Sequence, residues 1–246
     1  MVRPFYVRTM KQPKTIAIDG PAASGKTTIG QMLAERLNYL FLDTGCMYRA
    51  ATLAALQQEV DVYDETAVTH LAQHLNLHIQ PTNGETDGRV YTVLLNNQDV
   101  TWDIRLPDVD ANVSQVSSYK GVRQEMVKRQ REFGVNGRVI MVGRDIGTVV
   151  LPQAPLKLYI TASPAERAQR RWQDRHDQGH KTSYDDILAD VIRRDEIDSS
   201  RTHSPLRPAQ DAIIIDTTGR SPEVILDEIA NLITTLAHKS LHLSQP

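Results

Sequence analysis

GPAASGKTT, residues 20–28, is the stretch that decides the fold of this 246-residue chain. It fits the pattern G-x-x-x-x-G-K-[ST] at every fixed position. A short apolar run over 15–19 precedes it and predicts a buried strand, and a helical pattern follows from 25 to about 38. A strand, a glycine-rich turn and a helix in this order predict an α/β protein built on a parallel sheet.

The residue types in this turn are those that a phosphate-binding loop requires. Gly20 and Gly25 permit backbone angles that a side chain would forbid, so N–H groups can point inward around an anion. The helix that begins near Gly25 adds its positive end, Lys26 can reach the β- and γ-phosphates of a nucleotide, and the Thr27 hydroxyl is a Mg²⁺ ligand. The alternative is a glycine-rich turn with a solvated lysine. We expect the phosphates of ATP to be held by Gly20, Pro21, Ala22, Ala23, Ser24, Gly25, Lys26, Thr27 and Thr28.

The same rhythm of strand, turn and helix recurs along the chain, with one interruption. Strands are predicted over 39–42, 138–142, 156–160 and 212–215, each followed by a turn and a helix, the first of these helices over 45–58. The interruption has strand-like runs over 77–80, 89–95 and 100–104, separated by Asn-Gly and Asn-Asn turns, and then a helix over about 111–133. We therefore expect an antiparallel insert within a parallel scaffold.

Composition excludes several classes of protein. The chain is 40% hydrophobic and 24% charged, as is usual for a globular domain, and its formal net charge of −2 gives no global basic field for nucleic acid or an anionic membrane. The single cysteine, Cys46, cannot form an internal disulfide, which favours a reducing cytoplasm. No run approaches the roughly 20 apolar residues of a membrane span.

A second candidate anion site follows the strand over 39–42. Thr44 and Gly45 place a hydroxyl and backbone donors at a helix N-terminus, and Arg49 lies about one turn further along. Alternatively, Thr44 is only an N-cap and Arg49 a surface residue. Another strand ends in Arg144 and Asp145, at the edge where parallel sheets bind ligands, although these two could also form a structural ion pair. Two anion sites favour two phosphorylated substrates. The chain lacks the Asn-Lys-x-Asp motif of GTPases.

The sequence resembles bacterial cytidylate kinases, which belong to the nucleoside monophosphate kinase group, from about Lys14 to Ala237. The resemblance departs from the family at Cys46, where a small residue is commoner, and in the N-terminal extension. It rests on the loop at 20–28, Asp43–Arg49, Ser114–Val116, Val122-Arg123, Arg129–Arg131, Gly143–Val150, Glu166–Arg171, Arg194-Asp195, Asp198, Arg201 and Pro205-Leu206.

This resemblance implies a P-loop α/β/α fold of three layers with a central parallel sheet, a helical lid and an antiparallel monophosphate-binding insert. It implies phosphorylation of CMP and dCMP by ATP with Mg²⁺, in a protein that works as a monomer. The segments expected are a disordered extension at 1–13, a core at 14–62 and 134–238 with the lid at about 167–195, the insert at 63–133 and a tail at 239–246.

The resemblance also implies a role for each acceptor-site residue. Thr44, Tyr48, Arg49 and Arg144 would hold the CMP phosphate, Ser114, Arg123 and Asp145 would read the cytosine, and Asp198 and Arg201 would meet the sugar. The Asp145 carboxylate can accept a hydrogen bond from the N4 amine of cytosine, and Arg123 can donate to N3 and O2. Uracil has an acceptor in place of that amine, so a buried carboxylate would be left unpaired.

Two helices rich in arginine are predicted over 164–177 and 184–201, with Gln178-Gly179-His180 as a hinge. Arg167, Arg171 and Arg175 recur every four residues and so share one helix face. A closing lid would bring such cations onto the transferring phosphoryl group. The alternative is a solvated face that pairs with nearby aspartates. Together with Lys26, we expect the catalytic residues to be Arg167, Arg171 and Arg194.

Two other functions remain open from the sequence. The chain could phosphorylate another acceptor, such as UMP, dTMP or a small alcohol. It could also bind nucleotide without turnover, although Lys26, Arg144 and the lid arginines argue against that.

Overall fold

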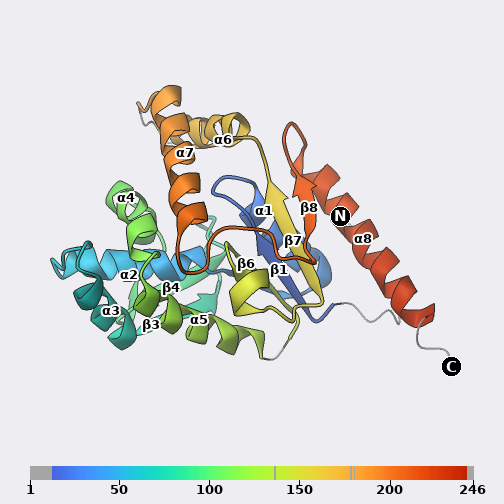
Figure 1. The fold of residues 1–246 in the computed structure, drawn as a ribbon, viewed down its shortest axis with the longest axis horizontal. Helices are drawn as coiled ribbons and strands as arrows, with labels where there is room; N and C mark the ends of the chain where they lie inside the picture. Colours follow the sequence, from blue (N-terminus) through green and yellow to red (C-terminus); the bar gives the residue numbers. More distant parts are fainter. Residues whose placement is uncertain (1–12, 136, 178, 180, 243–246) are drawn as a thin grey trace.

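The computed structural model describes residues 13–135, 137–177, 179 and 181–242 (Figure 1). Its centre is a five-stranded sheet in which all strands are parallel, in the order β2-β6-β1-β7-β8. This confirms the predicted parallel scaffold. The strands are β1 (Thr15–Asp19), β2 (Leu40–Asp43), β6 (Val139–Gly143), β7 (Leu156–Thr161) and β8 (Ile213–Asp216).

The register of the sheet brings three polar strand ends together. Asp19 at the end of β1 is level with Gly143 of β6, and Asp43 of β2 is level with Val142. The chain leaves β1 toward β2 and later returns to β7 on the other side of β1, so a crevice opens at the carboxyl ends of these strands. The P-loop, Asp43-Thr44 and Arg144-Asp145 all lie at this edge.

Helices cover both faces of the sheet and complete the predicted three layers. On one face, α1 (Lys26–Leu37) and α8 (Pro222–His242) pack in a core with Ile16 and Ile18 of β1. On the other face, α5 (Lys120–Gly134) and a short π-helix, Ile146–Val150, pack around Ala17 of the same strand. Alternation of side chains along β1 therefore supplies both cores.

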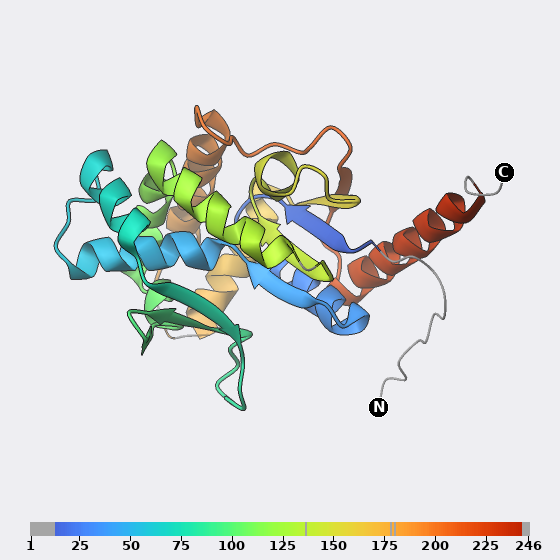
Figure 2. The same ribbon diagram turned by 90° about the horizontal axis from the view of Figure 1, so that it is seen from below.

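The insert forms one end of the molecule, and α8 lies at the other (Figures 1 and 2). The buried residues of the insert and those of α2 form one continuous core. This core includes Ala50, Val93 and Met126. The elements of this part are α2 (Gly45–Gln57), α3 (Glu65–His74), β3 (Leu77–Pro81), β4 (Tyr91–Leu95), β5 (Gln98–Asp99) and α4 (Pro107–Val116), followed by α5.

Two predicted elements of the insert are wrong in detail. The third strand is only Gln98–Asp99, because the Asp99 carboxylate accepts from Thr101 N–H (3.0 Å) and turns the chain, and Asp103–Arg105 is a 3₁₀-helix. The helix predicted over 111–133 is two helices, α4 and α5. Ser117 and Ser118 between them donate their hydroxyls to carbonyls three residues back and interrupt the helical ladder.

The helix α3 was not predicted. It begins at Asp64, whose carboxylate accepts from Ala67 N–H at 3.0 Å as an N-cap. Asp64 just before Glu65 is a possible N-cap and was the available sequence signal for α3. The apolar residues that follow have only a weak helical period, so the helix was not predicted from them.

Above the carboxyl ends of the strands stand α6 (Pro164–Asp177) and α7 (Tyr184–Ser200), as predicted for the lid (Figure 1). A small apolar cluster of Ala168, Ile187 and Val191 joins them. Of the predicted hinge, Gly179 has φ +81°, a conformation that favours glycine, while residues 178 and 180 lie outside the described part of the chain.

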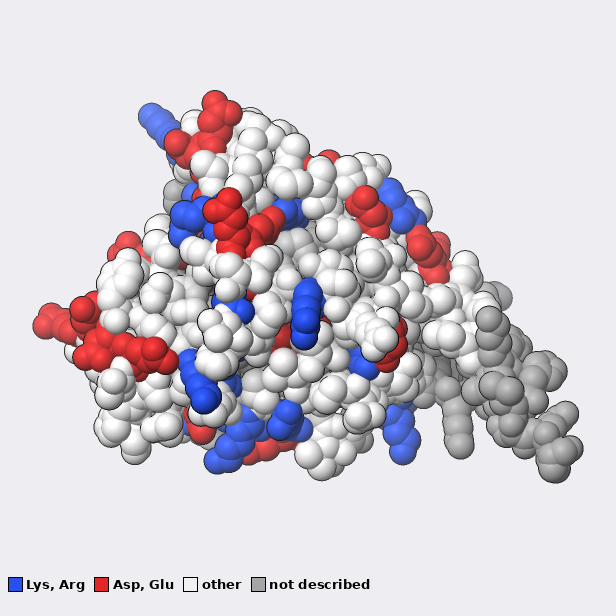
Figure 3. Space-filling model, in the orientation of Figure 1, with Lys and Arg blue, Asp and Glu red and all other residues white. Residues whose placement is uncertain are grey.

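The exposed charges agree with the composition. On the face seen in Figure 3, acidic and basic side chains of the described residues are interspersed over the lid, the insert and the core. Within the described residues, no helix combines the length and the apolar character needed to cross a membrane.

Candidate active site

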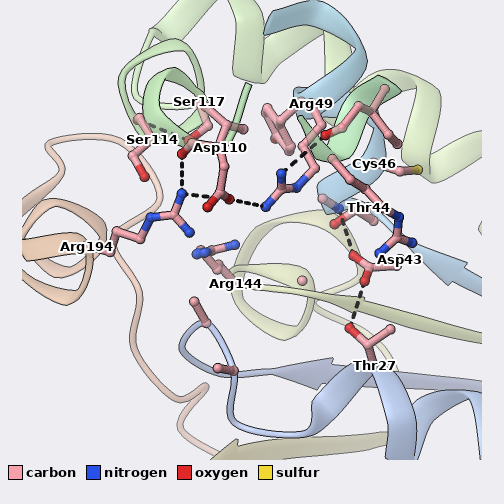
Figure 4. A pocket seen from close by; sticks show the side chains of 18 of the residues that line it. Thr27, Asp43, Thr44, Cys46, Arg49, Asp110, Ser114, Ser117, Arg144 and Arg194 are labelled. Carbon is pink, nitrogen blue, oxygen red and sulfur yellow. Dashed lines mark hydrogen bonds and ion pairs between the residues drawn. The ribbon is translucent and has the colours of Figure 1, made fainter. Parts of the chain in front are cut away.

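A cavity of about 690 Å³ opens between the P-loop, the start of α2, α4, the loop after β6 and the two lid helices (Figure 4). Most of the predicted site residues meet here, although they come from segments that are far apart in the sequence. Those lining the cavity are Ala22, Ala23, Lys26, Thr27, Thr28, Thr44, Tyr48, Arg49, Ser114, Arg123, Arg144, Asp145, Arg171, Arg194 and Arg201. The other predicted residues are not part of this lining: Gly20, Pro21, Ser24, Gly25, Arg167 and Asp198.

The P-loop has the backbone that its glycines were predicted to allow. A Cβ on Gly20 would lie 2.0 Å from the Ile160 carbonyl oxygen, and Gly25 has φ +86° at the start of α1. Lys26 is buried and donates from Nζ to the Pro21 carbonyl at 2.6 Å. Burial, with the neighbouring Arg144 adding to it, lowers the pKa of Lys26 to about 7 in the absence of a bound anion.

Thr27 and Asp43 place two oxygen donors beside the P-loop. The Thr27 hydroxyl donates to Asp43 Oδ2 at 2.8 Å (Figure 4). Mg²⁺ prefers hard oxygen ligands and in kinases is held by one or two protein groups together with substrate phosphates. A hydroxyl and a carboxylate at the mouth of a phosphate loop fit that requirement. Asp43 was not among the predicted metal ligands, although it ends a strand next to Thr44.

The second predicted anion site begins at the start of α2. Thr44 stands at the N-cap position, but its hydroxyl and its N–H both donate to the Val142 carbonyl, at 3.0 and 2.9 Å. Arg49 lines the cavity and donates to the Ile104 carbonyl at 3.2 Å, so it is not a free surface residue. The start of α2 is thereby tied to both β6 and the insert.

Arg123 and Asp145 form a buried ion pair at the inner end of the cavity. Each side chain is 5% exposed, and Arg123 Nη1 also donates to the Ser117 carbonyl at 2.9 Å. Arg123 Nε is buried without a hydrogen-bond partner among the described residues, and the guanidinium lies 5.3 Å from the centre of the Tyr48 ring. A buried donor and a carboxylate side by side can recognise a flat ligand that offers both acceptors and a donor.

Arg144 pairs with Asp198 rather than with its neighbour Asp145. Asp198 is 1% exposed and also accepts from Arg201, so it joins the loop after β6 to the end of α7. Burial lowers the pKa of Arg201 to about 9, and the nearby Arg144 and Arg123 contribute. The structure thus places Arg144 and Asp145 in two separate ion pairs.

Asp110 lies in the first turn of α4. Its carboxylate forms ion pairs with four arginines from three helices. Burial alone would raise the pKa of Asp110, but Arg194, Arg171 and Arg49 outweigh it and hold that pKa well below its usual range. Asp110 was not predicted from the sequence, because it belongs to no motif and its partners lie up to 84 residues away along the chain.

Arg167 contacts the P-loop from α6. It is 2% exposed and donates to the Ala22 carbonyl of the P-loop at 3.3 Å, and it forms a two-point ion pair with Asp195 of α7. It therefore connects both lid helices to the P-loop. Its predicted role as a phosphate ligand stays a prediction.

Asp19 links the end of β1 to the segment after Asp145, and it was not among the predicted site residues. Its carboxylate accepts from the N–H groups of Ile146 and Gly147, both at 2.7 Å, just after Arg144 and Asp145. Burial raises its pKa to about 6, although these two hydrogen bonds oppose the change. The position of an acid at the end of β1, directly before the P-loop, was the only sequence signal.

A phosphate loop at the end of a central parallel strand, facing a second, arginine-rich site across one cavity, defines a P-loop phosphotransferase. A sequence model of the family described as cytidylate kinase matches residues 16–235. A cytidylate kinase from Herpetosiphon aurantiacus is 49% identical over 225 residues, which are 92% of this chain and 96% of the relative. One from Bacillus subtilis is 43% identical over 224 residues, 91% of this chain and 98% of the relative.

Solved structures resemble the chain more distantly. A shikimate kinase from Acinetobacter baumannii, in complex with shikimate, matches with a TM-score of 0.43 and 17% identity, covering 92% of this chain and 95% of that one. From the sequence comparisons, the chain belongs to the cytidylate kinase family.

Proposed function

We propose that this protein transfers the γ-phosphoryl group of ATP to CMP and dCMP and so produces CDP and dCDP. The observation that carries the proposal is the single cavity in which the P-loop around Lys26 faces the buried Arg123–Asp145 pair. One site suits a triphosphate and the other suits the edge of a base. Membership of the cytidylate kinase family supports the same reaction.

Selection of cytosine rests on the donors and acceptors at the inner end of the cavity. Asp145 accepts from the N4 amine, while Arg123 and Ser114 face the N3 and O2 side. A uracil base would set its O4 acceptor against the carboxylate. Leaving such a group unpaired costs about 1–3 kcal/mol, which corresponds to roughly tenfold or more in discrimination.

The acceptor nucleotide extends from the base toward the P-loop. Asp198 and Arg201 lie on the sugar side, where Asp198 can accept from a ribose hydroxyl. Arg49 and Arg144 take the phosphate, with Thr44 and Tyr48 completing its surroundings. Thr44 needs only to rotate its hydroxyl away from the Val142 carbonyl to do this.

Transfer itself depends on fixed positive charge. Lys26, Arg171 and Arg194 surround the place where the two phosphates meet, and Arg167 holds the P-loop against the lid. The phosphoryl group passes between oxygens in line, with its charge spread over the equatorial oxygens, so positioning and neutralisation dominate the rate. Thr27 and Asp43 would hold Mg²⁺, which neutralises charge on the β- and γ-phosphates when bound.

The proposed function also concerns the cellular compartment, the oligomeric state and the partners of the enzyme. We place it in the cytoplasm as a monomer, acting on small-molecule substrates without nucleic acid or membrane. The single, buried Cys46 and the net charge of −2 support this placement.

An acceptor panel tests the proposal. ADP release from ATP and Mg²⁺ is followed with CMP, dCMP, UMP, dTMP and a small alcohol as acceptors. We expect kcat/KM for CMP and dCMP to exceed that for UMP by at least about tenfold. A clear preference for UMP or dTMP would overturn the assignment of the base site. ATP binding without any acceptor-dependent release would instead favour a nucleotide-binding protein without turnover.

A further inference from the structure

Asp110 is the meeting point of the arginines that face the cavity. Its Oδ1 accepts from Arg49 of α2 at 2.7 Å and lies 2.9 Å from Arg194 Nη2 of α7. Its Oδ2 accepts from Arg171 and, at 3.3 Å, from Arg175, both on α6. Figure 4 shows the carboxylate between Arg194 and Arg49, at the centre of the site.

The charges in this cluster do not balance. Four guanidinium groups pair with Asp110, and Arg171 and Arg194 also pair with Asp190, so two carboxylates leave an excess of two positive charges. Three of the arginines, Arg49, Arg171 and Arg175, donate hydrogen bonds to the carboxylate, and Arg194 donates to the Asp110 backbone carbonyl. The cluster therefore attracts a further anion, but Asp110 occupies one donor nitrogen each of Arg49, Arg171 and Arg175 that such an anion would use.

The partners of Asp110 belong to two groups in the proposed reaction. Arg49 is assigned to the acceptor phosphate, and Arg171 and Arg194 are assigned to the transferring phosphoryl group. A carboxylate bonded to members of both groups stands where the two phosphates would meet. We propose that the Asp110 carboxylate is an internal stand-in for substrate phosphate, which an incoming phosphate must displace and which thereby sets the affinity of the site. The assignment of the two groups rests on the proposed function, but the arginine cluster itself does not.

Its position in the fold also explains how Asp110 stays charged. Asp110 lies in the first turn of α4, where the helix dipole favours a negative charge, and its side chain is 11% exposed. Without it, four arginines from three helices would face one another in a poorly solvated space. Asp110 therefore holds the lid helices to α2 and α4 when no phosphate is present.

Binding of inorganic phosphate, without nucleotide, tests the inference. Asp110→Asn keeps the shape and removes the charge. We expect calorimetry to show phosphate binding about tenfold tighter than in the parent protein, since charge-assisted hydrogen bonds released from Asp110 become available. Asp174→Asn is the matched control, because Asp174 lines the same cavity but makes no ion pair among the described residues. It should change the affinity by less than about threefold.

The opposite sign would overturn the inference. If Asp110 only orients the arginines, Asp110→Asn binds phosphate equally or more weakly. Should that variant not fold, crystals of the parent protein soaked in phosphate give a second reading. We expect Asp110 to have left Arg49 and Arg194, whereas phosphate bound with all four ion pairs intact would contradict the proposal. Neither measurement depends on the acceptor panel, so failure of the proposed function and failure of this inference remain distinguishable.

Discussion

At the scale of single residues, Lys26 carries the most direct chemical prediction. In the proposed reaction, its ammonium group acts on charge that develops during transfer. We expect Lys26→Ala to lower kcat by about 10²–10³-fold, with a smaller change in the KM for ATP. Steady-state kinetics measures both, and an effect confined to KM would contradict this role. Thermal unfolding of the variant controls for loss of the folded state.

Asp145 carries the prediction for base selection. Asp145→Asn replaces a carboxylate by an amide that can donate as well as accept, so the ratio of kcat/KM for CMP to that for UMP should fall by about tenfold. The variant leaves Arg123 buried without its counter-ion, which costs about 3 kcal/mol of stability. Selectivity is therefore compared only under conditions where urea denaturation shows the variant to be folded. An unchanged ratio would remove Asp145 from base recognition.

What the sequence reveals at this scale depends on the range of the interaction. The P-loop is a local motif, so roles for Lys26 and Thr27 could be predicted from nine consecutive residues. Asp110 and Asp19 could not, because each acts through partners on distant segments, and an aspartate is not restricted to one role. The pairing of Arg144 with Asp198 instead of Asp145 is likewise decided by packing of α7 against the loop after β6.

At the scale of elements, the lid and the P-loop are joined through Arg167 and Asp195. If this ion pair fixes the lid helices to the loop, Arg167→Ala and Asp195→Ala should lower kcat by similar factors. Their double variant should lose little more than either single one, since both remove the same interaction. A phosphate ligand would behave differently: Arg167→Ala would be far more damaging than Asp195→Ala, and the two effects would multiply.

Most elements could be predicted because their apolar period is regular. The five parallel strands, the helices predicted over 25–38 and 45–58, and the two lid helices lie within a few residues of their predicted bounds. The errors fall where a polar side chain ends an element: Ser117 and Ser118 divide α4 from α5, and Asp99 ends β5. The π-helix at 146–150 has no sequence signature, because Asp19 on another strand fixes its first amides.

At the scale of the whole molecule, the two buried groups next to the P-loop make stability depend on pH. The pKa of Lys26 is lowered from 10.5 to about 7, so the unfolded chain binds more protons than the folded protein above pH 7, and stability rises with pH there. The pKa of Asp19 is raised from 3.8 to about 6, so its contribution to stability is lost as the pH rises through 6.

Urea denaturation between pH 7 and 8.5, without nucleotide, measures the first effect. The parent protein should gain up to about 1.4 kcal/mol per pH unit relative to Lys26→Met, in which the titrating group is absent. Parallel curves for the two proteins would show that Lys26 keeps its ordinary pKa in the folded protein.

The central claim is that two nucleotides lie end to end in one cavity, with their phosphates between the P-loop and the arginines of α2, α6 and α7. A crystal structure with a non-hydrolysable ATP analogue and CMP tests it most directly. We predict the triphosphate around Lys26, the cytosine amine on Asp145, and the CMP phosphate on Arg49 and Arg144. CMP bound elsewhere, or Arg49 and Arg144 turned away from its phosphate, would contradict the account.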